Sequence, residues 1–407
     1  MPRTTPASTL EAGWARADIT PPPALPMAGY LARKQPARGA LDPLEVRCLA
    51  LRQGRRRAVL VLIDWLLVES RWCKALRAEL ARRHGLPRSA VIVAATHTHA
   101  GPAVPTGPFV LGMPPDAAAR AYWQHARRKM QTAAAQALAA LRPVEAAWAR
   151  GAIGGVAGDR NRAGRWSKQP VLALRLRPRD GGAAAMVTVY GCHPTVLGPD
   201  NDRYSGDLLG AMARGLEASG IACALIANGA AANLSTRFTR QERTPAQVGR
   251  FAAVALGQMR RLRWCRPPAV RLRTIACSIE LPLRSREEAA AGPLSGEGAQ
   301  VWAELRRSRL FAANSLGIEI VLWQLGPFTL AALPLEIFAD TGAFLWRQVR
   351  MQVLGYANGY WGYLPSRSAR ARDYETVSSP FNRDGDRRLR FALTRSVLET
   401  RRRGPAA

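Results

Sequence analysis

Residues 91–102 read VIVAATHTHAGP, and this stretch decides the fold class. Its first five residues, Val91–Ala95, are all apolar and rich in β-branched side chains, which predicts a strand buried on both faces. The polar residues 96–99 follow at once, and Gly101-Pro102 then marks a turn. In layered α/β proteins, functional sites lie just beyond the carboxyl ends of such strands.

Apolar runs elsewhere in the chain alternate with Ala-, Leu- and Arg-rich stretches of helical character. The apolar runs predict further strands at residues 59–63, 185–190, 221–227, 318–323 and 328–333. The stretches between them predict helices at residues 71–84 and 115–141, and residues 290–298 are expected to form a loop. Strands interleaved with helices indicate an α/β fold with a buried sheet.

The composition narrows the class of protein. The 407-residue chain is 48% hydrophobic, which allows a large core and excludes wholesale disorder. No apolar run reaches the ~18 residues of a transmembrane helix, and the first residues lack the apolar segment of a secretion signal. None of the six cysteines stands in a CxxC pair, which argues against cysteine-held zinc. Free thiols without a secretion signal predict a cytoplasmic location.

The charge is strongly basic, with 59 Lys and Arg against 29 Asp and Glu and a formal net charge of +30. Such a charge attracts nucleic acid and anionic membranes without specificity. The arginines are scattered along the chain and are not interleaved with aromatic residues as in RNA-binding motifs. We therefore expect a solvated basic surface, no specific nucleic-acid partner, and at most peripheral contact with an anionic membrane.

Polar residues with metal-ligating chemistry follow several of the predicted strands. His97 and His99 are two residues apart, so their rings share one face if the segment is extended. His193 follows the strand at 185–190, and Glu336 lies between apolar residues, where a carboxylate is costly unless it is paired or metal-bound. Two histidines, a carboxylate and an open position form the pattern of catalytic zinc. The alternatives are histidines bonded to backbone and a glutamate at an exposed helix start.

Several further segments of the sequence, taken in their order along the chain, are informative together with these residues. They are GWARADITP (13–21), MAGY (27–30), ATHTHAGP (95–102), GCHPT (191–195), YSGD (204–207), NGAAANLSTR (228–237), LPLE (333–336) and GYANGYWGYLPS (355–366). In this order they resemble the neutral/alkaline non-lysosomal ceramidase family, in its N-terminal catalytic domain. The resemblance implies a layered α/β/α fold with a central mixed β-sheet and a single catalytic domain, here residues 1–385, followed by an Arg-rich C-terminal tail at 386–407.

The resemblance also implies an activity, that of a zinc-dependent amidohydrolase. It would cleave the amide bond of a ceramide-like N-acyl lipid, or of a smaller N-acyl amine, by attack of a metal-bound water. The family's Zn²⁺ ligands fall on His97, His193, Glu336 and Tyr363, with Tyr360 as the alternative tyrosine. The catalytic residues fall on His99, which orients the substrate or shuttles a proton, on Arg162, which contacts the oxyanion, and on Ser235.

Two departures from the family pattern bear on this assignment. Asn233 stands where the family often has an aspartate, which weakens Ser235 as a nucleophile because a serine needs an adjacent base. The chain also ends soon after Tyr363, so we expect no additional C-terminal domain like that of the larger secreted members. The alternatives are an esterase or another amidase on the same zinc site, and a catalytically silent protein that binds acidic ligands or nucleic acid.

Overall fold

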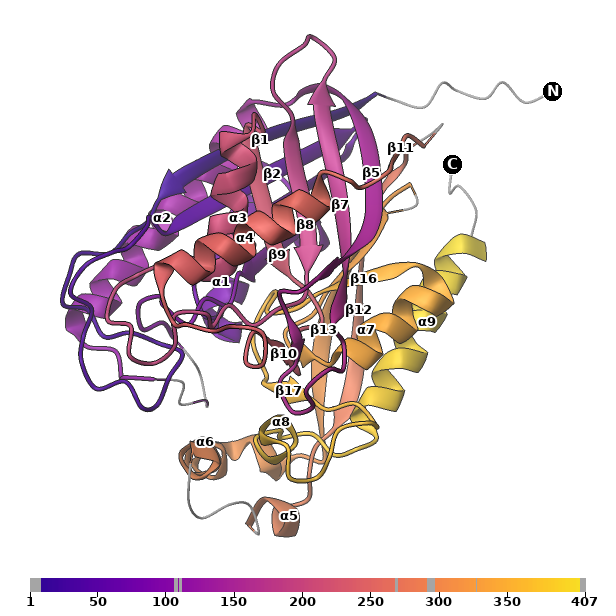
Figure 1. Cartoon of the computed structure of the whole chain (residues 1–407). Coiled ribbons are helices and arrows are strands. Elements are labelled where there is room, and N and C mark those ends of the chain that lie inside the picture. Colours follow the sequence, from indigo (N-terminus) through magenta and orange to yellow (C-terminus); the bar gives the residue numbers. More distant parts are fainter. Residues whose placement is uncertain are drawn as a thin grey trace.

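The computed structural model describes residues 9–105, 109, 112–267, 270–290, 297–326 and 328–402. Two β-sheets pack face to face, and helices cover the outer face of each (Figure 1). The strands of the larger sheet alternate their side chains between two cores with the expected period of two residues. In the strand that holds Leu60, that residue and Leu62 face the second sheet, whereas Val61 and Ile63 face the helices.

The larger sheet has nine strands in the order β4-β3-β2-β1-β5-β7-β8-β9, with β11 paired to β5. Only the β3–β4 and β8–β9 pairs are parallel, so the expectation of a central mixed sheet is confirmed. The strands are β1 (Leu10–Asp18), β2 (Glu45–Gln53), β3 (Arg56–Ile63), β4 (Val91–Ala95), β5 (Arg142–Gly154), β7 (Lys168–Pro178), β8 (Ala185–Tyr190), β9 (Cys223–Asn228) and β11 (Trp264–Cys265).

The second sheet has four strands in the order β12-β13-β14-β16, and the sequence analysis did not predict it as a separate layer. Its strands are β12 (Leu272–Pro282), β13 (Ser315–Leu325), β14 (Phe328–Ala332) and β16 (Met351–Leu354). Two short ladders lie apart from both sheets and prove important for the site. They pair β6 (Gly158–Asp159) with β10 (Leu234–Ser235), and β15 (Glu336–Ile337) with β17 (Tyr363–Leu364).

The helices divide between the two outer faces (Figure 1). On the larger sheet lie α1 (Ser70–His84), α2 (Ala117–Ala139), α3 (Asp207–Ala218) and α4 (Pro245–Met259). On the smaller sheet lie α7 (Ala339–Val349) and α9 (Gly385–Arg402). The shorter elements are α5 (Arg286–Ala290), α6 (Glu297–Arg307), α8 (Tyr374–Val377) and the 3₁₀ turns η1 (Arg88–Ala90) and η2 (Arg309–Ala312). Within the described residues, no helix is both long and apolar enough to cross a membrane.

The long apolar runs were predicted well. The predicted strand at 91–95 is β4, and the predicted strand at 185–190 is β8. The helices expected at 71–84 and 115–141 are α1 and α2, each shorter or longer by a residue or two at its ends. Buried strands and amphipathic helices carry their period in the sequence, which explains this agreement.

The structure differs from the predicted Arg-rich C-terminal tail at 386–407. Residues 386–402 belong to α9, whose Leu389, Leu393 and Val397 are fully buried against the rest of the chain. Their spacing of four residues is that of one helix face, and the intervening arginines occupy the other face. The expected loop at 290–298 is also only partly right, since Ala290 ends α5 and Glu297 begins α6, while 291–296 fall outside the described residues.

Candidate metal centre and active site

Three histidine rings meet beyond the carboxyl ends of β4 and β8. The Nε2 atoms of His97 and His99 lie 3.2 Å apart, and the ring centroids of His97 and His193 lie 4.9 Å apart. One nitrogen from each of the three rings lies within 4.8 Å of the others. We call His97, His99 and His193 the histidine wall.

Backbone carbonyls fix the tautomer of every ring in the histidine wall. The Nδ1 atom of His97 lies 2.7 Å from the oxygen of Leu66, and that of His99 lies 2.7 Å from the oxygen of Gly29. The Nδ1 atom of His193 lies 2.9 Å from the oxygen of Ala231. A carbonyl oxygen only accepts, so each Nδ1 carries the proton and each Nε2 presents a lone pair. Three lone pairs therefore face one another.

A buried carboxylate completes the cluster from the opposite side. Glu336 begins β15 and is 1% exposed. Its Oε2 atom lies 3.1 Å from Nε2 of His193 and 3.8 Å from Nε2 of His97. The parallel β15–β17 ladder sets Glu336 opposite Tyr363, so that the two residues are backbone neighbours.

Tyrosine hydroxyls surround this carboxylate. The hydroxyl of Tyr360 donates to Oε1 of Glu336 at 2.5 Å, and that of Tyr356 donates to Oε2 at 3.1 Å. The Tyr356 ring also stacks on His97, with 3.9 Å between ring centroids. We call Glu336, Tyr356, Tyr360 and Tyr363 the tyrosine wall, because three tyrosines gather around one carboxylate, two through hydroxyl bonds and Tyr363 through the β15–β17 ladder.

The backbone is strained where the two walls touch. His97 has φ of +68° and Tyr356 has φ of +54°, which is the left-handed region that L-residues other than Asn and Asp rarely occupy. The expectation that His97 and His99 share a face of an extended segment is therefore wrong in its geometry, because β4 ends at Ala95. The two rings nevertheless meet. Strain of this kind costs about 1–3 kcal/mol for each residue and gathers at functional sites.

Burial sets the protonation of both walls. Loss of solvent lowers the pKa of His97, His99 and His193 well below the usual histidine range, although Glu336 opposes the shift at His97. Burial, reinforced by the Glu336 carboxylate, raises the pKa of Tyr360 and Tyr363 well above the usual tyrosine range. Arg160 opposes the shift at Tyr363. Neutral imidazoles are the form that binds metals.

These donors fit a divalent cation. The inward nitrogens have no proton to share, and the Nε2 atom of His193 has no hydrogen-bond partner among the described residues. Lone pairs packed this closely repel one another unless a cation lies between them. Two or three imidazole nitrogens and one carboxylate form the donor set that zinc takes in catalytic sites. No other group of three or more metal-ligating side chains occurs among the described residues.

Arg162 does not reach the cluster, and Arg160 takes its place. The Nη2 atom of Arg162 donates to the backbone oxygen of Ser368 at 2.7 Å, near the surface. Arg160 instead forms an ion pair with buried Glu375 and donates to the hydroxyl of Tyr363 at 3.1 Å. The arginine that contacts the tyrosine wall therefore precedes Asn161, two positions before Arg162.

Ser235 lies beside the histidine wall without a catalytic partner. It is 5% exposed, forms a backbone bridge with His193, and its Oγ accepts the amide of Arg237 at 3.2 Å. Asn233, in place of the family aspartate, donates to Asp159 at 3.0 Å and accepts the amide of Ala339 at 2.9 Å. It therefore ties β6, β10 and α7 together and does not activate the serine.

Comparison with known proteins identifies the family of the chain and relatives of its fold. The profile of the neutral/alkaline non-lysosomal ceramidase family, N-terminal, matches residues 10–259. Neutral ceramidase from Pseudomonas aeruginosa superimposes with a TM-score of 0.76 at 18% identity, covering 98% of this chain and 76% of that chain. A ceramidase complexed with C2 gives a TM-score of 0.76 at 15% identity with the same coverage. No functionally curated sequence matches the chain. At these identities the two structures establish the fold.

Proposed function

Because the chain belongs to the neutral/alkaline non-lysosomal ceramidase family, we propose that it is a zinc-dependent amidohydrolase that cleaves the amide bond of an N-acyl lipid of the ceramide class. One observation carries the proposal. The inward Nε2 atoms of the histidine wall converge on the Glu336 carboxylate, and the Nε2 atom of His193 has no hydrogen-bond partner among the described residues.

The residues proposed to hold the zinc are His97, His193, Glu336 and Tyr363. Tyr363 is preferred over Tyr360 because the hydroxyl of Tyr360 is already donated to Glu336. The Tyr363 hydroxyl accepts from Arg160, which favours loss of its proton. A zinc ion held there supplies a Lewis acid for the amide carbonyl and lowers the pKa of a nearby water toward 7.

The chain's own residues supply the remaining chemistry. Arg160 presents a guanidinium at the site and can donate to an oxyanion as the carbonyl is attacked, a contribution of about 3–4 kcal/mol for one well-placed donor. His99 holds its Nδ1 proton on the oxygen of Gly29, and its ring centroid lies 5.0 Å from that of Tyr30, with the two rings tilted. Its Nε2 lone pair can accept the proton that the attacking water releases, and its lowered pKa makes that proton easy to pass on to the leaving amine.

The test is hydrolysis of N-acyl substrates by purified protein, before and after removal of metal with a chelator and readdition of zinc. We expect amide hydrolysis that increases with acyl-chain length, is lost on chelation and returns with zinc. A matched series of esters distinguishes the esterase alternative. Absence of hydrolysis of any amide or ester, by protein that contains its metal, would contradict the proposal.

Ser235→Ala separates two routes on this site. If water is the nucleophile, the substitution lowers kcat by only a few fold, because the Ser235 hydroxyl has no base to activate it. If the serine attacks, kcat falls by several orders of magnitude and an acyl-enzyme accumulates in the unsubstituted protein. Burst-phase kinetics with a chromogenic amide decide between the two.

A further inference from the structure

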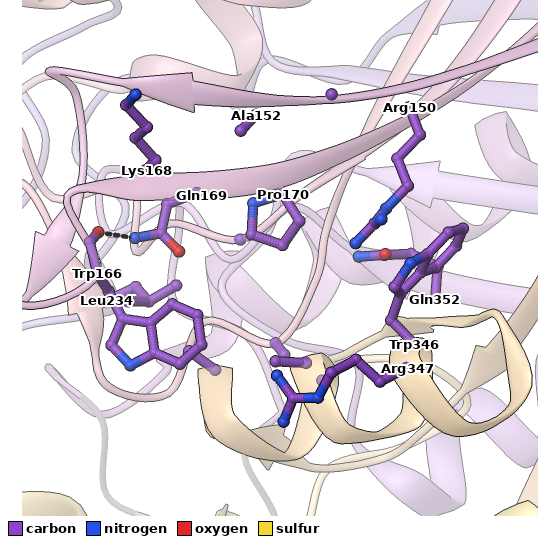
Figure 2. Close-up of a pocket in the computed structure, with 16 residues that line it drawn as sticks. Arg150, Ala152, Trp166, Lys168, Gln169, Pro170, Leu234, Trp346, Arg347 and Gln352 are labelled. Atoms are coloured by element: carbon purple, nitrogen blue, oxygen red, sulfur yellow. Dashed lines mark hydrogen bonds between the residues drawn. The ribbon is translucent and has the colours of Figure 1, made fainter.

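A second cavity lies behind the histidine wall. It has a volume of about 580 Å³ and is bounded by β5, β7, β16 and α7 (Figure 2). Gly191, Ala230 and Leu234 form its inner boundary. The same segments hold His193, whose Nδ1 lies 3.2 Å from the oxygen of Leu234. The cavity therefore adjoins the segments that hold His193, and none of the proposed metal ligands lines it.

The mouth of the cavity is cationic. Arg150, Lys168 and Arg347 line it and are exposed, and none of the lining residues is acidic. The guanidinium of Arg150 lies 3.7 Å from the ring centroid of Trp346, and that of Arg350 lies 5.9 Å from the same ring. Burial and the nearby Arg350 lower the pKa of Arg150. In Figure 2 the side chains of Arg150 and Arg347 approach the cavity from opposite sides. An anion bound beside Arg150 would offset the repulsion between the positive charges of Arg150 and Arg350.

The interior combines apolar surface with unused polar atoms. The Nε1 atoms of Trp166 and Trp346 and the Oε1 atom of Gln169 are buried and have no hydrogen-bond partner among the described residues. Trp166 also has φ of +54°, and the side-chain amide of Gln169 donates to its backbone oxygen, as the dashed line in Figure 2 marks. These polar atoms have almost no accessible surface, so a ligand in the cavity would contact the apolar side chains that line it, Leu234 among them.

We propose that this cavity binds an amphiphilic anion, an aliphatic carboxylate whose acidic group lies between Arg150 and Arg347 and whose chain lies against Trp166 and Leu234. The cavity volume falls within the range of about 300–1,000 Å³ that small-molecule sites occupy. The cationic mouth and the apolar interior match the two ends of such a molecule. This site is independent of the proposed hydrolysis.

The test is isothermal titration calorimetry of chelator-treated, full-length protein with decanoate, decanol and inorganic phosphate. Chelation prevents the carboxylate from binding a metal in the active site. We expect decanoate to bind with 1:1 stoichiometry and at least tenfold more tightly than decanol or phosphate. Decanol binding as tightly as decanoate, or phosphate binding as tightly as decanoate, would overturn the proposal.

Variants locate the binding. The double substitution Arg150→Gln and Arg347→Gln should weaken decanoate binding at least tenfold. The double substitution Arg128→Gln and Arg261→Gln removes the same charge from exposed positions elsewhere and should leave binding unchanged. Ala152→Phe, at an exposed position on β5 that lines the cavity, should block it. Thermal melting shows whether each variant is folded. If both folded cavity variants bind decanoate as tightly as the unsubstituted protein and the control variant do, the site is refuted.

Discussion

The two walls of the metal centre are built in different ways. The histidine wall follows the buried strands β4 and β8 of the larger sheet, and each imidazole is fixed by a backbone carbonyl. The tyrosine wall comes from the two-residue strands β15 and β17 and the loop between β16 and β17, and the hydroxyls of Tyr356 and Tyr360 bond the Glu336 carboxylate. The difference predicts that a substitution in the histidine wall leaves a neutral backbone carbonyl without its donor, whereas one at Tyr356 or Tyr360 leaves the buried Glu336 carboxylate without a donor, which costs more because the group is charged.

The largest effect expected among the residues next to the tyrosine wall is at Arg160. Arg160→Met removes the donor to Tyr363 and should lower kcat/KM by about 10²–10³-fold, the scale for loss of one oxyanion donor. Arg162→Met, its matched control two residues away, should change kcat/KM by no more than a few fold because the Arg162 guanidinium donates to the backbone oxygen of Ser368 near the surface. Equal losses in the two variants would contradict the assignment.

Because Arg160 also neutralises buried Glu375, its removal affects stability. Arg160→Met should lower the melting temperature, and Arg160→Lys, which keeps the charge, should recover most of the melting temperature but little of the activity. Recovery of both by lysine would show that only the charge matters and that the guanidinium geometry does not.

A smaller effect separates the two tyrosines that could serve as ligand. Tyr360→Phe removes a hydrogen bond to Glu336 and should weaken metal affinity by about 10–100-fold, as for other partners of metal ligands. Tyr363→Phe should weaken it further, since it removes a ligand. Competition with a fluorescent zinc chelator measures both affinities. A larger effect of Tyr360→Phe would reverse the assignment.

The smallest expected effect is a dependence of the free energy of unfolding on pH, to which the histidine wall contributes. The folded-state pKa of each histidine is lowered by burial, so between that value and the unfolded value of about 6.5 the unfolded state binds more protons. The contribution of these histidines to the free energy of unfolding is therefore fully present above about pH 6.5. It declines as the pH falls below that value, by up to about 1.4 kcal/mol per pH unit for each histidine. Asp207 acts with the opposite sign, since burial raises its pKa to about 6.

Urea unfolding of chelator-treated protein between pH 7.5 and 6 measures this slope. His193→Gln should reduce the slope, because one of the buried titrating rings is removed. Burial also lowers the pKa of His84, so part of the slope arises outside the histidine wall and should remain in this variant. A free energy of unfolding that is flat across this range would show that the rings are not held neutral in the folded state.

The same contrast explains which parts of the fold and of the site could be predicted from the sequence. Runs such as Val91–Ala95 and 185–190 are apolar throughout, so the strands and the histidines that follow them were predicted from local pattern. Strand β12 was missed because its side chains alternate between buried and exposed positions and include several polar residues. Two strands of the second sheet, β13 and β14, were therefore predicted, but their place in a separate layer follows only from the folded chain.

The tyrosine wall was only partly accessible from the sequence. The resemblance pointed to Glu336 and Tyr363, and the β15–β17 ladder pairs them, but no local pattern predicts a ladder of two residues. Tyr356, which bonds Glu336 and stacks on His97, was missed although it lies within a quoted segment. Arg160 was missed because its position depends on a long-range bond from its amide to the oxygen of Asn233, at 2.8 Å.

The central claim is that both walls hold one divalent ion, and elemental analysis of purified protein tests it most directly. We expect one zinc per chain in the unsubstituted protein and in His125→Ala, and little or none in folded His97→Ala, His193→Ala or Glu336→Ala. Full zinc occupancy in all three of these variants, or none in the unsubstituted protein after zinc is supplied, would contradict it.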